Sequence, residues 1–149
     1  MKGFEICFFR HGIALDREDP GVTTDAERPL TEEGIRKTRM AAEGLKRMDA
    51  GFEKILTSPW LRASQTASIL SEVLLLPAPE EMVELEGDRT AEDLVAALPH
   101  RLARRTLLVG HEPLLSATAV HILGGDFALD VGGKAAERQG QEIDDEQGG

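Results

Sequence analysis

Three short apolar runs, separated by segments with helix signals, constrain the fold of this chain more than any other feature. The runs are predicted to be buried strands, and they cover residues 4–9, 52–57 and 106–109. A weaker strand is predicted near 82–85, and helices are predicted over 32–48, 59–74, 90–98 and 113–123. Strands that alternate with helices are typical of parallel sheets. The sequence therefore predicts an α/β fold, a three-layer sandwich with a mostly parallel sheet flanked by helices.

A triplet suited to phosphate chemistry follows the first apolar run. It is Arg10-His11-Gly12, and it lies at the carboxyl end of the predicted strand, where α/β folds place ligands. A neutral histidine is a competent nucleophile toward phosphorus, and the planar arginine fork suits phosphate oxygens. Gly12 has no Cβ, which leaves room for a bulky anion near the backbone. The triplet therefore predicts a phosphate site, with Gly12 as a substrate-binding position.

The second and third apolar runs supply two more residues of the same kind. After the second run, Ser58 is predicted to be the N-cap of a helix and Pro59 its first residue. Arg62 then lies one turn inside that helix, close to its positive end. The third run is followed by His111. Because the carboxyl ends of parallel strands gather along one sheet edge, Arg62 and His111 are expected to join the first triplet.

These blocks, taken in order, resemble those of the histidine phosphatase superfamily, which includes phosphoglycerate mutases and acid phosphatases. Within it the chain is most similar to the compact SixA-type phosphohistidine phosphatases, and the resemblance covers residues 4–124. The matching segments are Arg10-His11-Gly12, 28–34, 58–66, 85–88 and 110–113. The resemblance implies a phosphoglycerate mutase-like fold and a phosphatase activity. It also implies catalytic roles for the residues His11, Arg10, Arg62 and His111.

The charges of these four residues predict which role each has in phosphoryl transfer. A phosphoryl group in transfer carries negative charge on three equatorial oxygens, and Arg10, Arg62 and a protonated His111 form a cationic cage for it. Neutral His11 attacks phosphorus in line and becomes phosphohistidine, which water then hydrolyses. This route needs no metal and no other cofactor. The cations are expected to keep His11 neutral, but they oppose the positive charge on His111.

Further residues near these blocks are predicted to contact the substrate or its leaving group. Arg28 and Glu86 are predicted substrate-binding residues, and the loop over 13–29 is expected to form a rim of the pocket. The candidate general acids are Glu84, Glu86 and Asp88. Because none of the three stands out, the sequence favours a leaving group that needs no acid. A phosphohistidine fits, since its ring can leave as neutral imidazole, whereas an alkyl phosphate leaves as an alkoxide.

Composition argues against several other functions. The net charge of -10 is unfavourable for binding nucleic acid, and no run approaches the roughly 18 apolar residues of a membrane helix. The four histidines lack the paired spacing of zinc sites, so no metal is predicted. A single cysteine fits a reducing compartment, and no segment at the amino terminus looks like a signal peptide. The expected location is therefore the cytoplasm.

The sequence divides into one predicted domain and a tail. The histidine phosphatase domain is expected to span residues 1–128, and 129–149 is expected to be an acidic, disordered tail, with six acidic residues against two basic ones over 130–149. The expected partner is a phosphohistidine-bearing protein or a small phosphorylated substrate. Two alternatives stay open: a small-molecule phosphomonoesterase of the same superfamily, and a non-catalytic phosphate-binding module on the same fold.

Overall fold

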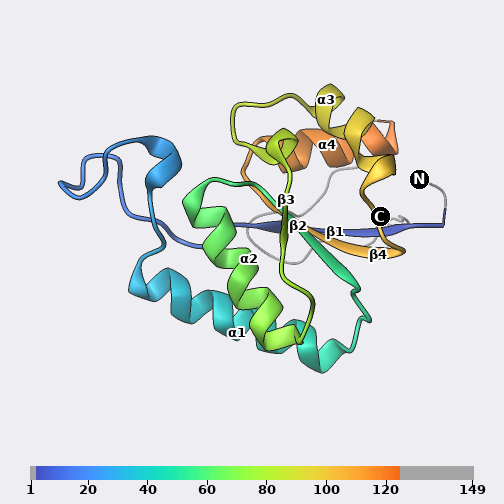
Figure 1. The fold of residues 1–149 in the computed structure, drawn as a ribbon, viewed down its shortest axis with the longest axis horizontal. Helices are drawn as coiled ribbons and strands as arrows, with labels where there is room; N and C mark the ends of the chain where they lie inside the picture. Colours follow the sequence, from blue (N-terminus) through green and yellow to red (C-terminus); the bar gives the residue numbers. More distant parts are fainter. Residues whose placement is uncertain (1–2, 125–149) are drawn as a thin grey trace.

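The computed structural model describes residues 3–124, which contain a sheet of four parallel strands. The strands are β1 (Glu5–Arg10), β2 (Lys54–Thr57), β3 (Glu80–Glu81) and β4 (Arg105–Gly110). Their order is β1-β4-β2-β3, so the carboxyl ends of β1, β4 and β2 lie side by side (Figure 1). The three strands predicted from the apolar runs are confirmed, with ends that differ by at most two residues.

Helices cover both faces of the sheet, which confirms the three-layer sandwich. On one face lie α1 (Glu32–Met48) and α2 (Leu61–Leu74), and on the other lie α3 (Ala91–Ala97) and α4 (Leu114–Leu123) (Figure 1). Successive side chains of a strand point to opposite faces. Phe9 and Leu107 therefore pack in the apolar cluster with α1 and α2, whereas Phe8 and Leu108 pack with α3 and α4. Burial on both faces explains why these strands are continuously apolar in sequence.

The start of α2 lies two residues later than predicted. The helix begins at Leu61, so Ser58 is not its N-cap and Pro59 is not its first residue. Ser58 Oγ instead accepts a hydrogen bond from the Trp60 N–H at 3.1 Å and lies 2.9 Å from His111 Nε2. The serine thus stabilises the bend between β2 and α2 and contacts the end of β4.

The predicted strand over 82–85 is wrong. β3 lies two residues earlier, and Val83–Leu85 form a short 3₁₀ helix, η2. Met82 and Leu85 are both buried, and their spacing of three residues suits a helical turn that directs both side chains into the core. The predicted helix over 90–98 is observed as α3, followed by a second 3₁₀ turn, η3 (Leu98–His100).

The long loop between β1 and α1 is fixed at its base. Thr31 caps α1, because its hydroxyl accepts the Gly34 N–H at 2.9 Å, and its own N–H donates to the Ile13 carbonyl oxygen. Gly34 lies so close to the loop that a Cβ there would stand 2.1 Å from that same oxygen. Farther along the loop, Asp25–Glu27 form a 3₁₀ turn, η1. The chain immediately after β1 is therefore held against the first turn of α1.

Two sequence predictions concern membrane segments and the carboxyl-terminal tail. Across residues 3–124, no helix has both the length and the apolar character needed to span a bilayer. The predicted acidic tail over 129–149 lies outside the described residues, and so does the predicted domain boundary at residue 128. Both the tail and the boundary stay predictions.

Candidate active site

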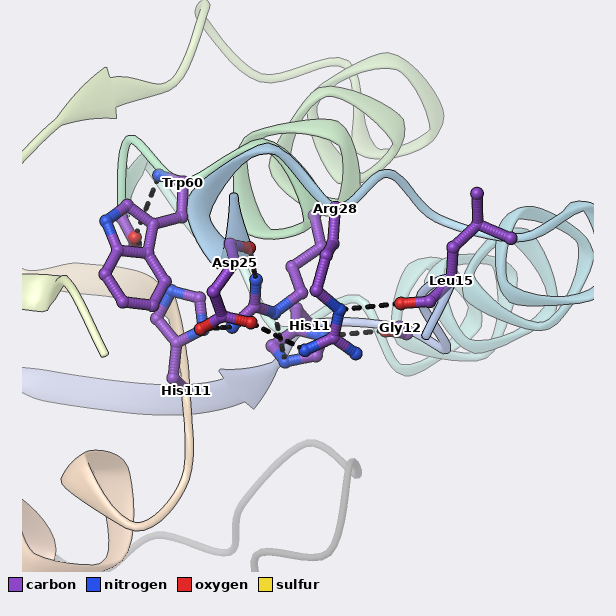
Figure 2. A network of polar contacts seen from close by, with 9 residues as sticks. His11, Gly12, Leu15, Asp25, Arg28, Trp60 and His111 are labelled. Atoms are coloured by element: carbon purple, nitrogen blue, oxygen red, sulfur yellow. Dashed lines mark hydrogen bonds and ion pairs between the residues drawn. The ribbon is translucent and has the colours of Figure 1, made fainter. Parts of the chain in front are cut away.

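Two histidines and an arginine meet at the carboxyl edge of the sheet, where the strand-end argument expects them. His11 follows β1, His111 follows β4, and Arg62 lies in the first turn of α2. Arg62 Nε donates a hydrogen bond to His11 Nε2 at 3.2 Å. The two imidazole rings lie near each other, with centroids 5.1 Å apart, and Trp60 packs against His111 at 4.9 Å (Figure 2). The edge thus holds one compact cluster of rings and a guanidinium group.

Arg10, the fourth predicted residue, borders the same site from the end of β1. Its side chain is exposed, and within the described part of the chain it makes no hydrogen bond or ion pair. It lines a cavity of about 440 Å³ that also borders His11, a size common for small-ligand sites. Arg28 and Lys37 line the same cavity. The space beside His11 is therefore surrounded by positive charge.

His11 is held neutral with one nitrogen available to react. Its Nδ1–H donates to the Gly12 carbonyl oxygen at 2.7 Å, which leaves the lone pair on Nε2. The pKa of His11 is lowered to about 4, mainly by burial and also by the cations Arg62, Arg10 and Arg28, against the opposing effect of the Gly12 hydrogen bond. At neutral pH the imidazole is uncharged and Nε2 is a nucleophile.

His111 is also neutral in the ligand-free site, which differs from the predicted imidazolium. The residue is 2% exposed, and burial, followed by the charges of His11 and Arg62, lowers its pKa to about 3. Its Nε2 lies 2.9 Å from Ser58 Oγ, whereas Nδ1 has no hydrogen-bond partner among residues 3–124. Ser58 Oγ accepts from the Trp60 N–H and keeps both a second lone pair and its hydroxyl hydrogen, so its contact with His111 Nε2 fits either neutral tautomer. In the tautomer with the proton on Nδ1, His111 carries an N–H that no residue within 3–124 accepts.

The buried His111 and the half-buried His11 should make the folded protein sensitive to mild acid. Unfolded histidines take up protons near pH 6.5, whereas His11 and His111 do so near pH 4 and pH 3 when folded. The unfolded state therefore binds more protons between these values, and the free energy of unfolding falls as pH drops below 6.5. The slope is up to about 1.4 kcal/mol per pH unit for each histidine. Urea denaturation between about pH 7 and about pH 5 measures this slope.

Histidine variants separate this effect from the titration of other groups. The variant His111→Asn should remove close to half of the histidine contribution to the slope, because one of the two imidazoles with a lowered pKa is gone. The matched control is His100→Asn, which removes an exposed histidine in η3 and should leave the slope unchanged. Equal slopes for wild type and His111→Asn would contradict the assignment.

Asp25, which sequence reasoning missed, joins two arginines at the site. Its backbone oxygen accepts Arg62 Nη1 at 2.6 Å, and its carboxylate oxygens lie 3.5 Å from Arg62 Nη2 and 2.8 Å from Arg28 Nη1. Figure 2 shows the Asp25 carboxylate between Arg28 and the His111 side of the site. The spacing of three residues from Asp25 to Arg28 suits an ion pair within one turn and was the available signal. The contact with Arg62, 37 positions away, has no sequence signal.

Arg28 lies at the site, but part of its guanidinium is already used. Its Nε donates to the Leu15 carbonyl oxygen at 2.6 Å, and Nη1 pairs with Asp25. These contacts hold the arginine against the loop that follows β1. The predicted contact of Arg28 with a substrate stays a prediction, and the structure places its charge close enough to lower the pKa of both histidines.

The structure shows a packing reason for a glycine at position 12, which the sequence analysis did not consider. The Gly12 N–H donates to Thr66 Oγ1 at 3.0 Å, and a Cβ would stand 2.5 Å from Thr38 Oγ1 and 3.2 Å from the Gly34 carbonyl oxygen. A side chain at this position would thus collide with α1, although Gly12 still lines the cavity beside His11. The glycine lets the chain after β1 pack against α1 and α2, and its contact with substrate stays a prediction.

The candidate acids after β3 do not join the histidine cluster. Glu86 pairs with Arg89 at 3.2 Å, and none of the three candidates makes a hydrogen bond or ion pair with either site histidine or Arg62 within residues 3–124. The next residue, Gly87, does touch the site. A Cβ there would stand 2.8 Å from the Trp60 ring and 3.3 Å from His111. The structure therefore brings this segment to the site without singling out Glu84, Glu86 or Asp88 as an acid.

The fold and the site together define a phosphate-handling enzyme. One edge of a parallel sheet gathers two neutral histidines and three arginines, a combination suited to binding and transferring a phosphoryl group. Among residues 3–124, no group of three or more histidine, cysteine, aspartate or glutamate side chains is arranged to hold a metal ion.

Comparison with known proteins gives the family. The family model of the histidine phosphatase superfamily (branch 1) matches residues 6–87, so the chain belongs to this superfamily, and this membership together with its similarity to SixA supports a phosphatase activity. An uncharacterized protein of Picosynechococcus sp. is 41% identical over 124 residues, which cover 81% of this chain and 74% of the relative. The phosphohistidine phosphatase SixA of Escherichia coli is 32% identical over 127 residues, which cover 82% of this chain and 76% of that protein.

A solved structure agrees with these relatives. The protein histidine phosphatase SixA complexed with tungstate matches with a TM-score of 0.69 and 30% sequence identity, over 78% of this chain and 75% of that chain. The predicted resemblance to SixA-type proteins and the predicted phosphoglycerate mutase-like α/β fold are therefore confirmed.

Proposed function

We propose that this phosphatase uses His11 as a covalent nucleophile and hydrolyses phosphohistidine on a protein. The observation that carries the proposal is the state of His11. Its Nδ1–H is tied to the Gly12 carbonyl, its pKa is far below neutrality, and its reactive Nε2 faces the Arg62 Nε–H at 3.2 Å. A neutral, oriented imidazole beside guanidinium groups is the arrangement that in-line attack on phosphorus requires.

In the first step His11 Nε2 attacks phosphorus. The Nε2–P bond forms as the bond from phosphorus to the leaving group breaks, and the equatorial oxygens gain donors from Arg62, Arg10 and His111. Arg62 exchanges its contact with His11 Nε2 for a contact with a phosphoryl oxygen. In the second step water attacks phosphorus, the Nε2–P bond breaks, and His11 returns to neutral with inorganic phosphate as product. The positive charge for both steps comes from side chains, so the proposed route is independent of metal.

The leaving group points to the substrate. None of Glu84, Glu86 and Asp88 bonds to the cluster within residues 3–124, so a leaving group that carries its own proton is favoured. A phosphohistidine ring protonated on its second nitrogen leaves as neutral imidazole, whereas a simple alkyl phosphate would need an acid. The name of the Escherichia coli relative, phosphohistidine phosphatase, supports the same substrate class.

A small phosphomonoester is the second candidate. The cavity beside His11 has a volume of about 440 Å³ and is lined by Arg10, Arg28 and Lys37, which suits a small anionic molecule. Such a substrate would require an acid or a leaving group that is stable as an anion.

Phosphate release in EDTA from two substrates tests the proposal. A phosphohistidine-bearing protein should be hydrolysed much faster than para-nitrophenyl phosphate, with no loss of rate on chelation. Rapid quenching should trap phosphate on the enzyme in an acid-labile, base-stable form, as expected for an N–P bond. Faster hydrolysis of para-nitrophenyl phosphate would instead favour a small phosphomonoester as the substrate. Absence of both turnover and trapped phosphate in folded protein would overturn the proposal in favour of a binding module.

A further inference from the structure

We infer that the Asp25 carboxylate is a built-in competitor for the phosphate site, which holds Arg28 and Arg62 when no substrate is present and weakens the binding of free phosphate. The inference rests on the proposed function only in taking these two arginines as phosphate ligands. It assigns Asp25 a role in specificity, namely discrimination against inorganic phosphate, and no role in bond breaking.

The first support is the number of guanidinium groups that Asp25 occupies. Arg62 gives Nε to His11, Nη1 to the Asp25 backbone oxygen and Nη2 to the Asp25 carboxylate. Arg28 gives Nε to Leu15 and Nη1 to the other carboxylate oxygen of Asp25. A phosphate oxygen that binds either outer nitrogen of Arg62, or Nη1 of Arg28, therefore replaces or shares a contact that Asp25 already makes.

The second support is charge. Arg10, Arg28 and Arg62 surround the site, and Asp25 is the anion whose carboxylate contacts two of them. The hydrogen bond from Arg28 holds the Asp25 pKa below its usual value, so the carboxylate is ionised at neutral pH. An ionised carboxylate repels a phosphate dianion bound to the same arginines.

The third support is that the carboxylate can leave without disturbing Arg62. The strong contact to Arg62 is the 2.6 Å hydrogen bond to the Asp25 backbone oxygen, whereas the carboxylate contact is 3.5 Å long. The Asp25 side chain is one-third exposed and sits on η1, in the middle of the loop. Orientation of the nucleophile-facing arginine thus depends on backbone, and the carboxylate mainly adds negative charge.

This arrangement favours substrate over product. Inorganic phosphate has only its oxygens with which to displace Asp25. A phosphoryl group carried by a protein gains further contacts from the surface around it, and these compensate for the lost ion pairs. After hydrolysis the carboxylate returns to the arginines and promotes release of phosphate.

Calorimetric titration of inorganic phosphate into the full chain tests the inference. The variant Asp25→Asn keeps the size and the backbone oxygen but removes the charge, and it should lower the Kd for phosphate by about tenfold. The matched control is Glu18→Gln, an exposed residue of the same loop, which should change the Kd less than twofold. The inference would be overturned if the Kd for phosphate of Asp25→Asn were equal to or higher than that of the wild-type protein.

Two further measurements keep the outcomes distinct. In turnover assays Asp25→Asn should show stronger inhibition by added phosphate, with a lower Ki, which a merely structural role would not produce. If Asp25→Asn folds poorly by thermal unfolding, Asp25→Ala removes the same charge and should tighten phosphate in the same direction. If Asp25→Asn binds phosphate more tightly but the wild-type protein shows no turnover, the proposed function is overturned and this inference stands. If the wild-type protein turns over substrate but Asp25→Asn does not bind phosphate more tightly, this inference is overturned and the proposed function stands.

Discussion

Replacement of His11 by asparagine should lower phosphate release by more than about 10⁴-fold. Asparagine has similar size and polarity, but its amide cannot form the N–P bond, so both steps of the proposed reaction are lost. Arg62 and Arg10 remain, and inorganic phosphate should still bind within a few fold of wild type. Initial rates with the phosphohistidine protein measure the loss, and titration calorimetry measures the retained phosphate binding.

The control for His11 is another histidine of the same chain. His100→Asn removes an exposed imidazole and should leave the rate unchanged. The quench experiment adds a qualitative outcome, since trapped enzyme-bound phosphate should disappear in His11→Asn. Retention of one per cent or more of the wild-type rate, or trapping of phosphate on the variant, would show that another group is the nucleophile.

Replacement of Arg62 by lysine should lower kcat by about 10²- to 10³-fold. Lysine keeps one positive charge but cannot reproduce the three contacts of the guanidinium, which reaches His11 with Nε and Asp25 with both outer nitrogens. The Nε–H donor beside His11 is lost, so kcat should fall by a larger factor than KM rises. Steady-state kinetics on both substrates measure kcat and KM separately.

The matched control for Arg62 lies on the outside of the molecule. Arg39→Lys changes an exposed arginine that pairs with Glu72, and kcat should stay within twofold of wild type. Because Arg62 is 5% exposed, thermal unfolding of Arg62→Lys must show a folded protein at the assay temperature. A folded Arg62→Lys with less than a fivefold loss in kcat would contradict a direct role in phosphoryl transfer.

The main features of the site could be predicted because they depend on strand ends. His11 and His111 follow apolar runs, and Arg62 follows a third run by one helical turn, so a parallel sheet brings them together whatever the loops do. Asp25 could not be predicted in this way. Its position depends on how a loop of 17 residues between Ile13 and Pro29 folds back toward α2, and local spacing says nothing about that contact.

Other errors arose where one physical effect competes with another. The 82–85 segment is apolar enough for a strand, but Met82 and Leu85 both enter the core, and only a helical turn directs residues three apart to one side. For Gly12 the structure adds packing against Thr38 and Gly34 as a reason for the glycine, and the predicted contact with an anion stays a prediction. His111 is neutral in the ligand-free site because of its burial, which residue types alone do not reveal.

The placement of Trp60 gives the protein a natural optical reporter. The chain has one tryptophan and no tyrosine, so excitation in the near ultraviolet reaches a single indole. That indole lies 4.9 Å from the His111 ring and 5.2 Å from the Arg62 guanidinium carbon. Its emission therefore comes from the edge of the candidate site. We expect oxyanion binding, and protonation of His111, to change this emission, so that both can be followed in real time without a dye or an engineered label.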